Sequence, residues 1–406
     1  MKILYRLTFF AIFSIVVIFV IGYARGYRFD MEKKSIKSTG IISTSSSPKA
    51  AKIYANGELK GVTDTNLTLA PGDYNIEIKK DGYTSWSKKF NLKGELVLTA
   101  DALLFPLNPS LSPLTNLGIV KAIPLDQTNR VILFVENNDE VKDGIYLFEA
   151  NSKPFISPLK LLILKKYLPL NSEFADSQMV ISSDYKKAIL ELTDVTSKTS
   201  KVFAYLLSLD QENTNIFDIT ASRDTLLEAW NKDKNKNDKK ILETFPKNFV
   251  KTASESAQIL SFSPNETKIM YQATETVILP IAITPPIIAS NQTPEERMLK
   301  QNHYYIYDRK EDKNYDITQL IPAKNKQNET ALQFPIIWYS DSRHLIVNEG
   351  KKISVIEYDG ANKQTVYSGP FDSQFFTTTS DGNLLVLANL NPDNNKYPDL
   401  YTVGIK

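Results

Sequence analysis

Hydrophobic and polar positions divide the chain into one long apolar segment and many short runs separated by turns. The long segment covers residues 7–24 and carries no charged side chain, LTFFAIFSIVVIFVIGYA. A helix rises about 1.5 Å per residue, so this segment would span about 27 Å, close to the hydrocarbon thickness of a bilayer. We therefore predict a short tail and a transmembrane anchor over residues 1–30, with the membrane as a partner through Leu7 to Ala24.

Two other interpretations of this segment stay open. Gly22 and Ala24 are small residues with the spacing of a signal-peptide cleavage site, so the segment can be removed from the mature protein. A helix buried in a soluble core is the third interpretation. Tyr5 and Tyr23 lie where interfacial aromatic residues are expected, which favours the uncleaved anchor.

Short alternating runs follow the apolar segment. Residues 31–48 are rich in Ser and Lys and are expected to form a linker. Residues 49–107 are expected to form a small all-β module, because apolar and polar residues alternate with a period of two between turn signals. The predicted strands are 51–55, 58–63, 74–79, 83–92 and 95–99.

The turns of this module carry a resemblance. Asn-Gly predicts a type I′ hairpin, because that turn needs positive φ at both central residues, and Pro-Gly predicts a second turn. The residues that fit the pattern are Asn56, Gly57, Gly61, Pro71, Gly72, Tyr74, Gly82 and Tyr83. In these positions the module resembles a PEGA domain, although the four residues from Pro71 replace the signature and Thr63-Asp64 replaces a usual Thr-Pro.

The PEGA resemblance implies a small β-sandwich-like module of prokaryotic envelope proteins that serves binding or surface attachment, with no catalysis. Tyr74, Tyr83 and Trp86 form either an aromatic ligand platform or, as we prefer for so small a module, part of its core.

Residues 112–406 repeat one phrase, in which a polar turn with Asp or Asn precedes three or four apolar residues. The copies are Asp126–Phe134, Ser183–Leu190, Ser263–Tyr271, Ser340–Val347 and Ser380–Leu387. Each is followed by a second apolar run, as in a β-propeller whose blades cover each other's faces. The turns resemble those of TolB-like propeller repeats, and the five copies of the phrase predict a propeller of five or more blades. The whole chain is thus expected to be mainly β.

Two insertions interrupt this region, at residues 222–250 and 277–300. The first contains Asn231–Lys240, a Lys-rich run that we expect to be a solvated loop, with contact to an anionic surface as the alternative. The second begins with an apolar, proline-broken stretch that is either tucked over the propeller or exposed as a docking surface. The candidate partner surface consists of Ile278, Leu279, Ile281, Ile283, Ile287 and Ile288.

Composition excludes several classes of site. The 406 residues include no Cys and two His, with 48 Lys+Arg against 46 Asp+Glu, a net charge of +2. Thiolate metal sites and cysteine nucleophiles are therefore excluded, and near-neutrality argues against a nucleic-acid partner. No common catalytic motif occurs, so we predict no catalytic residue, cofactor or metal ligand. His303, His344 and the turn residues Asp184, Asp341 and Asp381 are expected to be structural.

Two signals disagree on orientation. Two basic residues precede the apolar segment and five follow it closely, which by the positive-inside rule would keep the body cytosolic. The PEGA resemblance implies the opposite, and we follow it. We expect a non-catalytic binding or scaffolding protein anchored in the envelope, whose propeller contacts a protein or a cell-surface glycan. The alternative is an extracytoplasmic propeller enzyme or enzyme accessory of hydrolase type, which needs an acid pair near Trp338 or Phe375, where the sequence is uncharged.

Overall fold

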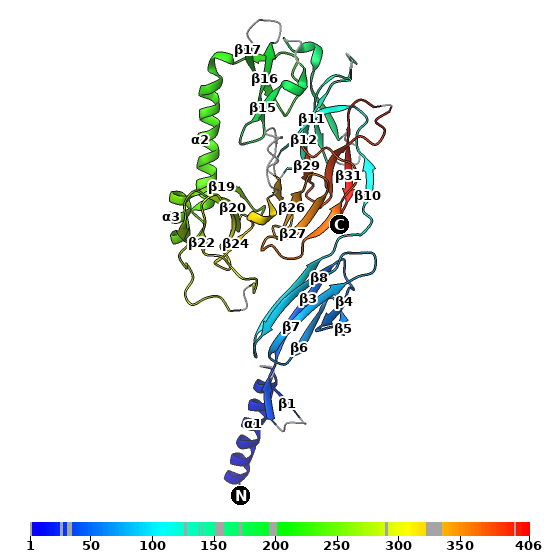
Figure 1. Cartoon of the computed structure of the whole chain (residues 1–406). Helices are drawn as coiled ribbons and strands as arrows, with labels where there is room; N and C mark the ends of the chain where they lie inside the picture. Colours follow the sequence, from blue (N-terminus) through cyan, green and yellow to red (C-terminus); the bar gives the residue numbers. More distant parts are fainter. Residues whose placement is uncertain are drawn as a thin grey trace. The chain divides into compact units, whose positions relative to one another are not determined.

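The computed structural model describes residues 2–24, 27–30, 35–125, 128–137, 139, 141–150, 158–169, 173–194, 201–288, 291–321, 335–393 and 395–406. The chain is mainly β and groups into two compact units, coloured from blue to red along the sequence (Figure 1). The first unit comprises Met1–Asn108 and Ile283–Pro294, and the second comprises Pro109–Ala282 and Glu295–Lys406.

The predicted apolar segment is helix α1 (Lys2–Ala24), followed by a hairpin of β1 (Tyr27–Asp30) and β2 (Ser35–Ser38). The part Tyr5–Tyr23 is long and apolar enough to cross a membrane, and none of it is buried inside the protein. Nothing in the described chain therefore supports the buried-core interpretation. A helix that is apolar all round and has no protein cover suits a membrane anchor or a signal peptide.

The N-terminal β module has two sheets. One contains β3 (Gly40–Ser47) between β6 (Thr65–Leu69) and the parallel strand β9 (Val97–Leu103). The other is ordered β5 (Glu58–Val62), β4 (Lys52–Ala55), β7 (Gly72–Lys79) and β8 (Trp86–Leu92). Inward-facing residues of both sheets form one core, which includes Ile42, Ile53, Ile76, Ile78, Trp86, Phe90 and Leu98. Trp86 is therefore a core residue, with Tyr74 and Tyr83 packed against that core, as we preferred.

The linker predicted over residues 31–48 is wrong from Ser35 onward, because Ser35–Ser38 is strand β2 and β3 is the middle strand of the first sheet. Its Ser-rich sequence hides a period-two pattern in which Ile42, Thr44 and Ser46 are buried. The hydroxyls are satisfied, since Thr44 donates to the Thr65 carbonyl at 2.7 Å. Short hydroxyl side chains with such partners fit a sheet interior as well as a linker. Residues 31–34 lie outside the described residues.

The second unit is a β-propeller of five four-stranded sheets. The first blade contains β11 (Ile119–Leu125), β12 (Arg130–Val135), β13 (Gly144–Glu149) and β14 (Leu159–Leu164), and the second contains β15 (Gln178–Ile181), β16 (Lys187–Asp194), β17 (Lys201–Ser208) and β18 (Phe217–Asp218). The third contains β19 (Ala257–Phe262), β20 (Lys268–Ala273), β23 (Tyr304–Asp308) and β24 (Lys313–Asp316). The fourth contains β25 (Ile336–Trp338), β26 (His344–Asn348), β27 (Ile353–Glu357) and β28 (Gln364–Tyr367). The fifth contains β29 (Phe376–Thr378), β30 (Leu384–Ala388), β31 (Asp399–Gly404) and β10 (Ser110–Pro113).

The repeated phrases lead into the second strand of each blade. Residues Val131, Leu133 and Val135 of β12 pack toward the fifth blade, while Ile132 and Phe134 pack toward the second. A strand covered by neighbours on both faces needs apolar residues at every position, which explains the uninterrupted run VILFV. The first turn residue, Asp126, lies outside the described residues.

Strand β10 closes the ring. It is the first strand of the second unit in the sequence, but it forms the outer strand of the fifth blade, where it pairs antiparallel with β31. The side chain of Asp399 is only 7% exposed, and its carboxylate holds the segment that follows β10 by hydrogen bonds. One of its oxygens accepts from the backbone N–H groups of Leu117 at 2.7 Å and Gly118 at 3.2 Å, and from the Thr115 hydroxyl at 3.1 Å. Gly118 takes φ +71, which glycine adopts without strain.

Helices occupy the first insertion. They are α2 (Arg223–Leu242) and α3 (Lys247–Ser256), and the short turns of 3₁₀ helix elsewhere are Lys165–Tyr167, Phe174–Asp176, Thr220–Ser222 and Thr318–Leu320. The loop predicted for the Lys-rich run is therefore wrong, since Asn231–Lys240 belongs to α2. Lysine has good helix propensity, and the run stays solvated because nearly all of its residues are exposed on the helix surface. The second insertion contains a hairpin of β21 (Val277–Ile278) and β22 (Met298–Leu299).

Replacing Asp399 by Ala should open the closing blade. The change removes an acceptor for two backbone N–H groups in a buried place, and each unsatisfied group costs about 1–3 kcal/mol. We expect the free energy of unfolding to fall by about 2–5 kcal/mol, measured by urea denaturation followed by tryptophan fluorescence. The exposed Asp393→Ala in the same blade is the control and should change it by less than about 0.5 kcal/mol. Equal losses in both variants would contradict this account of the closure.

Candidate functional site

The PEGA-like residues build the frame of the N-terminal module. Asn56 and Gly57 both take positive φ, 51 and 85, as the predicted hairpin turn requires. The Asn56 side chain also accepts from the backbone N–H of Asn75 at 2.7 Å. Gly61 and Gly82 take φ +150 and +82. Four further residues of this set are placed as follows: Pro71 is exposed, Gly72 begins β7, the Tyr74 hydroxyl donates to the Ala70 carbonyl at 2.9 Å, and half-buried Tyr83 bridges to Pro106.

One detail of that prediction is wrong. The Pro-Gly dipeptide predicts a turn, in which glycine can take positive φ, but Gly72 is not among the positive-φ glycines and lies in the extended backbone of β7. It starts the pairing with β8, opposite Leu92. Gly72 is the first residue of β7. The Pro-Gly pattern therefore located the start of this strand correctly but predicted the wrong backbone conformation for Gly72.

The six residues of the candidate partner surface do not form one patch. Leu279 is buried with Leu299 in the core beneath α3, because the hairpin turns alternate side chains inward. Ile278 and Ile281 are 67% and 58% exposed in the second unit. Ile283, Ile287 and Ile288 belong to the segment grouped with the first unit, where Ile288 is 72% exposed. The segment is therefore partly tucked and partly exposed.

The turn acids have the structural role predicted for them. Asp184 accepts from the Ser182 hydroxyl at 2.7 Å and from the backbone N–H of Lys186. Asp381 accepts from the Thr379 hydroxyl and the Asn383 side chain. Asp341 accepts from the backbone N–H groups of Arg343 and His344. These carboxylates thus hold the turns that precede the second strands.

Both histidines are paired with an aspartate. His344 is 4% exposed, and its Nδ1 lies 2.6 Å from Asp341 Oδ2. His303 Nδ1 lies 2.9 Å from Asp316 Oδ2 at the start of β23. Each pair also holds a backbone turn through its carboxylate. Among the described residues, no group of three metal-ligating acids or histidines occurs.

The central channel of the propeller is the main candidate site. A cavity of about 770 Å³ is lined by residues from the innermost strand of every blade, β11, β15, β19, β25 and β29. This volume lies within the range of about 300–1,000 Å³ of small-molecule sites. The lining combines apolar surface with amides and hydroxyls, and includes Met179, Ile337, Trp338, Gln178, Gln374, Thr377 and Ser380.

Among the described residues that line the cavity, Lys121 is the one with a charged side chain. Its ammonium donates to the Ser177 carbonyl at 2.5 Å. Burial lowers the pKa of the Lys121 ammonium, while the nearby Asp176 charge opposes this shift. A half-buried cation next to an aromatic and amide surface favours an anionic or strongly polar ligand group. The acid pair that the hydrolase alternative needs has no counterpart among these lining residues.

Sequence reasoning could not find the channel. Its residues come from five strands far apart in the chain, and each strand contributes only two to four side chains. Trp338 is 8% exposed and its indole N–H donates to the Ser261 hydroxyl of another blade at 3.1 Å. Phe375 is a core residue and lies outside the lining. A second cavity, between α2 and the β15–β16 turn, was also missed.

Residues 39–106 match the model of the PEGA domain, so this part of the chain is a PEGA domain. No curated protein matches the sequence closely enough to count as a relative. Similar solved structures include the putative TolB of Agrobacterium tumefaciens, with 11% identity and TM-score 0.21, covering 69% of this chain and 70% of that one. The soluble aldose sugar dehydrogenase of Escherichia coli shows 10% identity and TM-score 0.26, covering 74% and 100%.

A third similar structure is the β-propeller domain of the trilobed protease of Pyrococcus furiosus, with 8% identity and TM-score 0.19, covering 93% of this chain and 88% of that one. The propeller assignment follows from the five four-stranded sheets of the described residues themselves. The predicted PEGA module is confirmed, but the match begins at residue 39, whereas the sequence analysis placed the start at residue 49.

The Asp341 pair should make stability depend on pH. Burial alone would raise the pKa of Asp341, but hydrogen bonds from His344 and Arg343 outweigh it and hold the pKa below its ordinary value. The ionised group therefore stabilises the fold above about pH 4, and this contribution is lost as pH falls through the lower folded pKa. Asp341→Asn should cost about 1–2 kcal/mol at pH 7 and less at pH 3.

Urea unfolding of the wild type and the variant at the two pH values measures this difference. Asp210→Asn, at an exposed position of the second blade, is the matched control and should leave stability unchanged at both values. A loss in Asp341→Asn that is the same at pH 3 and pH 7 would show that packing, and not the charge, carries the effect.

Proposed function

We propose that this chain is a non-catalytic binding protein of a prokaryotic cell envelope, held in the membrane by α1. In this proposal the PEGA domain serves surface attachment, and the propeller binds a protein or a cell-surface glycan outside the membrane. The observation that carries the proposal is the channel, whose described lining residues offer aromatic, amide and hydroxyl groups and one cation, and include no carboxylate. Such a surface can recognise a ligand, whereas acid–base catalysis needs titratable pairs with separated pKa values.

The anchor and the PEGA domain support the location. Helix α1 has the length and uncovered apolar surface of a membrane segment, and its only described neighbour along the chain is a short hairpin. The positive residues after α1 argue for a cytosolic body, so orientation is the part of the proposal that an experiment must decide first.

Orientation can be tested with the full chain carrying a tag after Lys406. Protease added to intact cells should remove the tag, because the propeller is proposed to lie outside. Its exposed loops give the protease access, and a cytosolic reporter in the same cells controls for lysis. Protection of the tag until the membrane is breached would place the body in the cytosol and overturn the envelope role.

Ligand binding in the channel can be tested with a photo-crosslinking benzophenone residue at Gln374, an exposed lining position. Irradiation of cells should yield a discrete adduct, since this group inserts into C–H bonds of proteins and glycans alike. The adduct should disappear in Lys121→Glu, which reverses the charge of the channel. The same crosslinker at exposed Lys201 on β17 is the control. Equal adducts at both positions, or none at Gln374, would contradict binding in the channel.

A further inference from the structure

Helix α2 spans two blades, and Leu242 at its last position is the one residue of the helix that is buried in the described chain. At its start the Arg223 guanidinium contacts Glu191 of β16, with Nε and Oε1 2.6 Å apart, and this glutamate is 7% exposed. At its end Leu242 is buried, as is Phe245 just beyond it, and Phe249 of α3 stacks on Tyr307 of the third blade with ring centroids 3.9 Å apart. The helix of 20 residues thus joins the second and third blades as a strut about 30 Å long.

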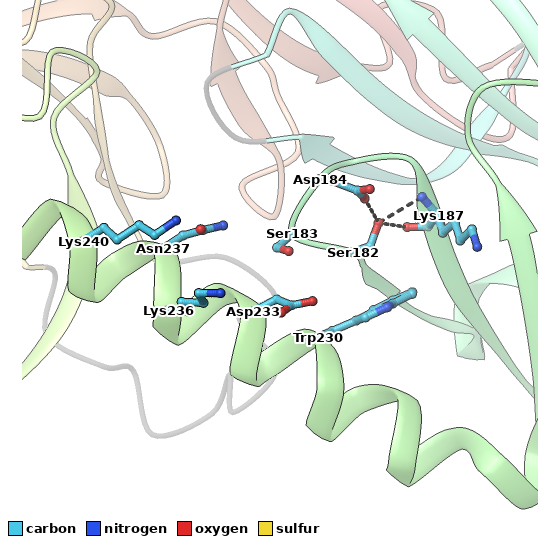
Figure 2. A pocket seen from close by; sticks show the side chains of 9 residues that line it. All are labelled: Ser182, Ser183, Asp184, Lys187, Trp230, Asp233, Lys236, Asn237 and Lys240. Atoms are coloured by element: carbon cyan, nitrogen blue, oxygen red, sulfur yellow. Dashed lines mark hydrogen bonds between the residues drawn. The ribbon is translucent and has the colours of Figure 1, made fainter.

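The middle of the strut turns a polar face toward its own propeller. Trp230, Asp233, Asn237 and Lys240 recur every three or four residues and so share one side of the helix. Figure 2 shows these side chains and Lys236 on the side of the β15–β16 turn. A surface helix normally buries an apolar stripe on this side. Here the space stays open as a cleft of about 360 Å³, completed by Ser182, Ser183, Asp184 and Lys187.

Several groups in the cleft keep free binding capacity. Within the part of the chain that the structure describes, the ammonium groups of Lys187, Lys236 and Lys240 form no salt bridge, and the indole N–H of Trp230 has no hydrogen-bond partner. Asp184 is occupied by its own turn, where hydrogen bonds from Ser182 and Lys186 hold its pKa below the ordinary value. These three ammonium groups therefore outnumber the one carboxylate that remains available in the cleft, which belongs to Asp233.

We propose that this cleft is a second binding site, which takes a saccharide carrying acidic groups, such as a uronic acid. A sugar ring has an apolar C–H face that packs on the indole of Trp230, while hydroxyls pair with its N–H and with the amide of Asn237. The acidic groups lie near Lys236 and Lys240 on the helix and Lys187 across the cleft. A purely apolar ligand would leave these charges desolvated, and a bare anion would leave Trp230 unused.

The site is independent of the channel, because none of its residues lines that cavity. It differs from a general basic patch as well. The same helix carries Lys232 and Lys239 outside the cleft lining, so the specific claim concerns the inner face and not the net charge of α2.

The test uses the full chain in detergent micelles and isothermal titration calorimetry with trigalacturonate at low salt. We expect saturable binding, weakened about tenfold or more when the ligand is the methyl ester, which keeps the sugar and removes its charges. Trp230→Leu should abolish measurable binding, since it keeps apolar volume and helix propensity but removes the ring and its N–H. The Lys236→Gln/Lys240→Gln double variant should weaken binding about tenfold.

The matched control is Lys232→Gln/Lys239→Gln, which has the same net charge and the same helix, and it should bind within about twofold of wild type. Thermal unfolding of each variant verifies the fold, and the two lysine variants, altered only at exposed positions, test the proposal even if Trp230→Leu unfolds. Equal weakening in both lysine pairs, equal affinity for the methyl ester, or no binding of trigalacturonate would each overturn the proposal. A negative result here leaves binding in the channel untouched, since crosslinking at Gln374 measures that site separately.

Discussion

The propeller depends on the pairing of β10 with β31. Five blades in a ring leave an exposed sheet edge wherever the ring does not close, and an N-terminal strand added to the C-terminal blade removes that opening. Leu107 is hydrogen-bonded to Gly82 of the PEGA domain, and β10 begins at Ser110, so residues 108 and 109 alone separate Leu107 from the closing strand. The buried Asp399 then holds the residues that lead into β11.

This closure explains which parts of the fold the sequence could predict. The second and third strands of the blades are covered on both faces and read as continuous apolar runs, so the phrases ending at Phe134 or Val347 pointed to them directly. Three of the innermost strands have only three or four residues, as in Ile336–Trp338, and all five line the channel, where amides and hydroxyls are tolerated. The hydrophobic pattern that these strands leave in the sequence is therefore weak. Strand β10 has the sequence SLSP, and its role follows only from the ring that it completes.

The candidate sites were harder to predict for a related reason. The channel has no sequence signature, because its lining is assembled from side chains such as Lys121 and Gln374 that lie more than two hundred residues apart. The turn residues, in contrast, form their hydrogen bonds with residues that lie only a few positions away in the sequence. Asp341 reaches only Arg343 and His344, so a local pattern was enough to assign it a structural role. Local chemistry is readable from sequence, whereas a site built across blades requires the topology first.

Helix α2 shows why a Lys-rich run can be helical without being packed. The first turn of a helix is costly to form, whereas each further residue adds one backbone hydrogen bond. Here the contacts of Arg223 at one end and Leu242 at the other supply fixed ends, and the polar residues between them need only continue the helix. Packing therefore places no demand on the inner face of the strut. The side chains there, Trp230 among them, are free of a role in the core, which is the physical condition for a cleft that can hold a ligand.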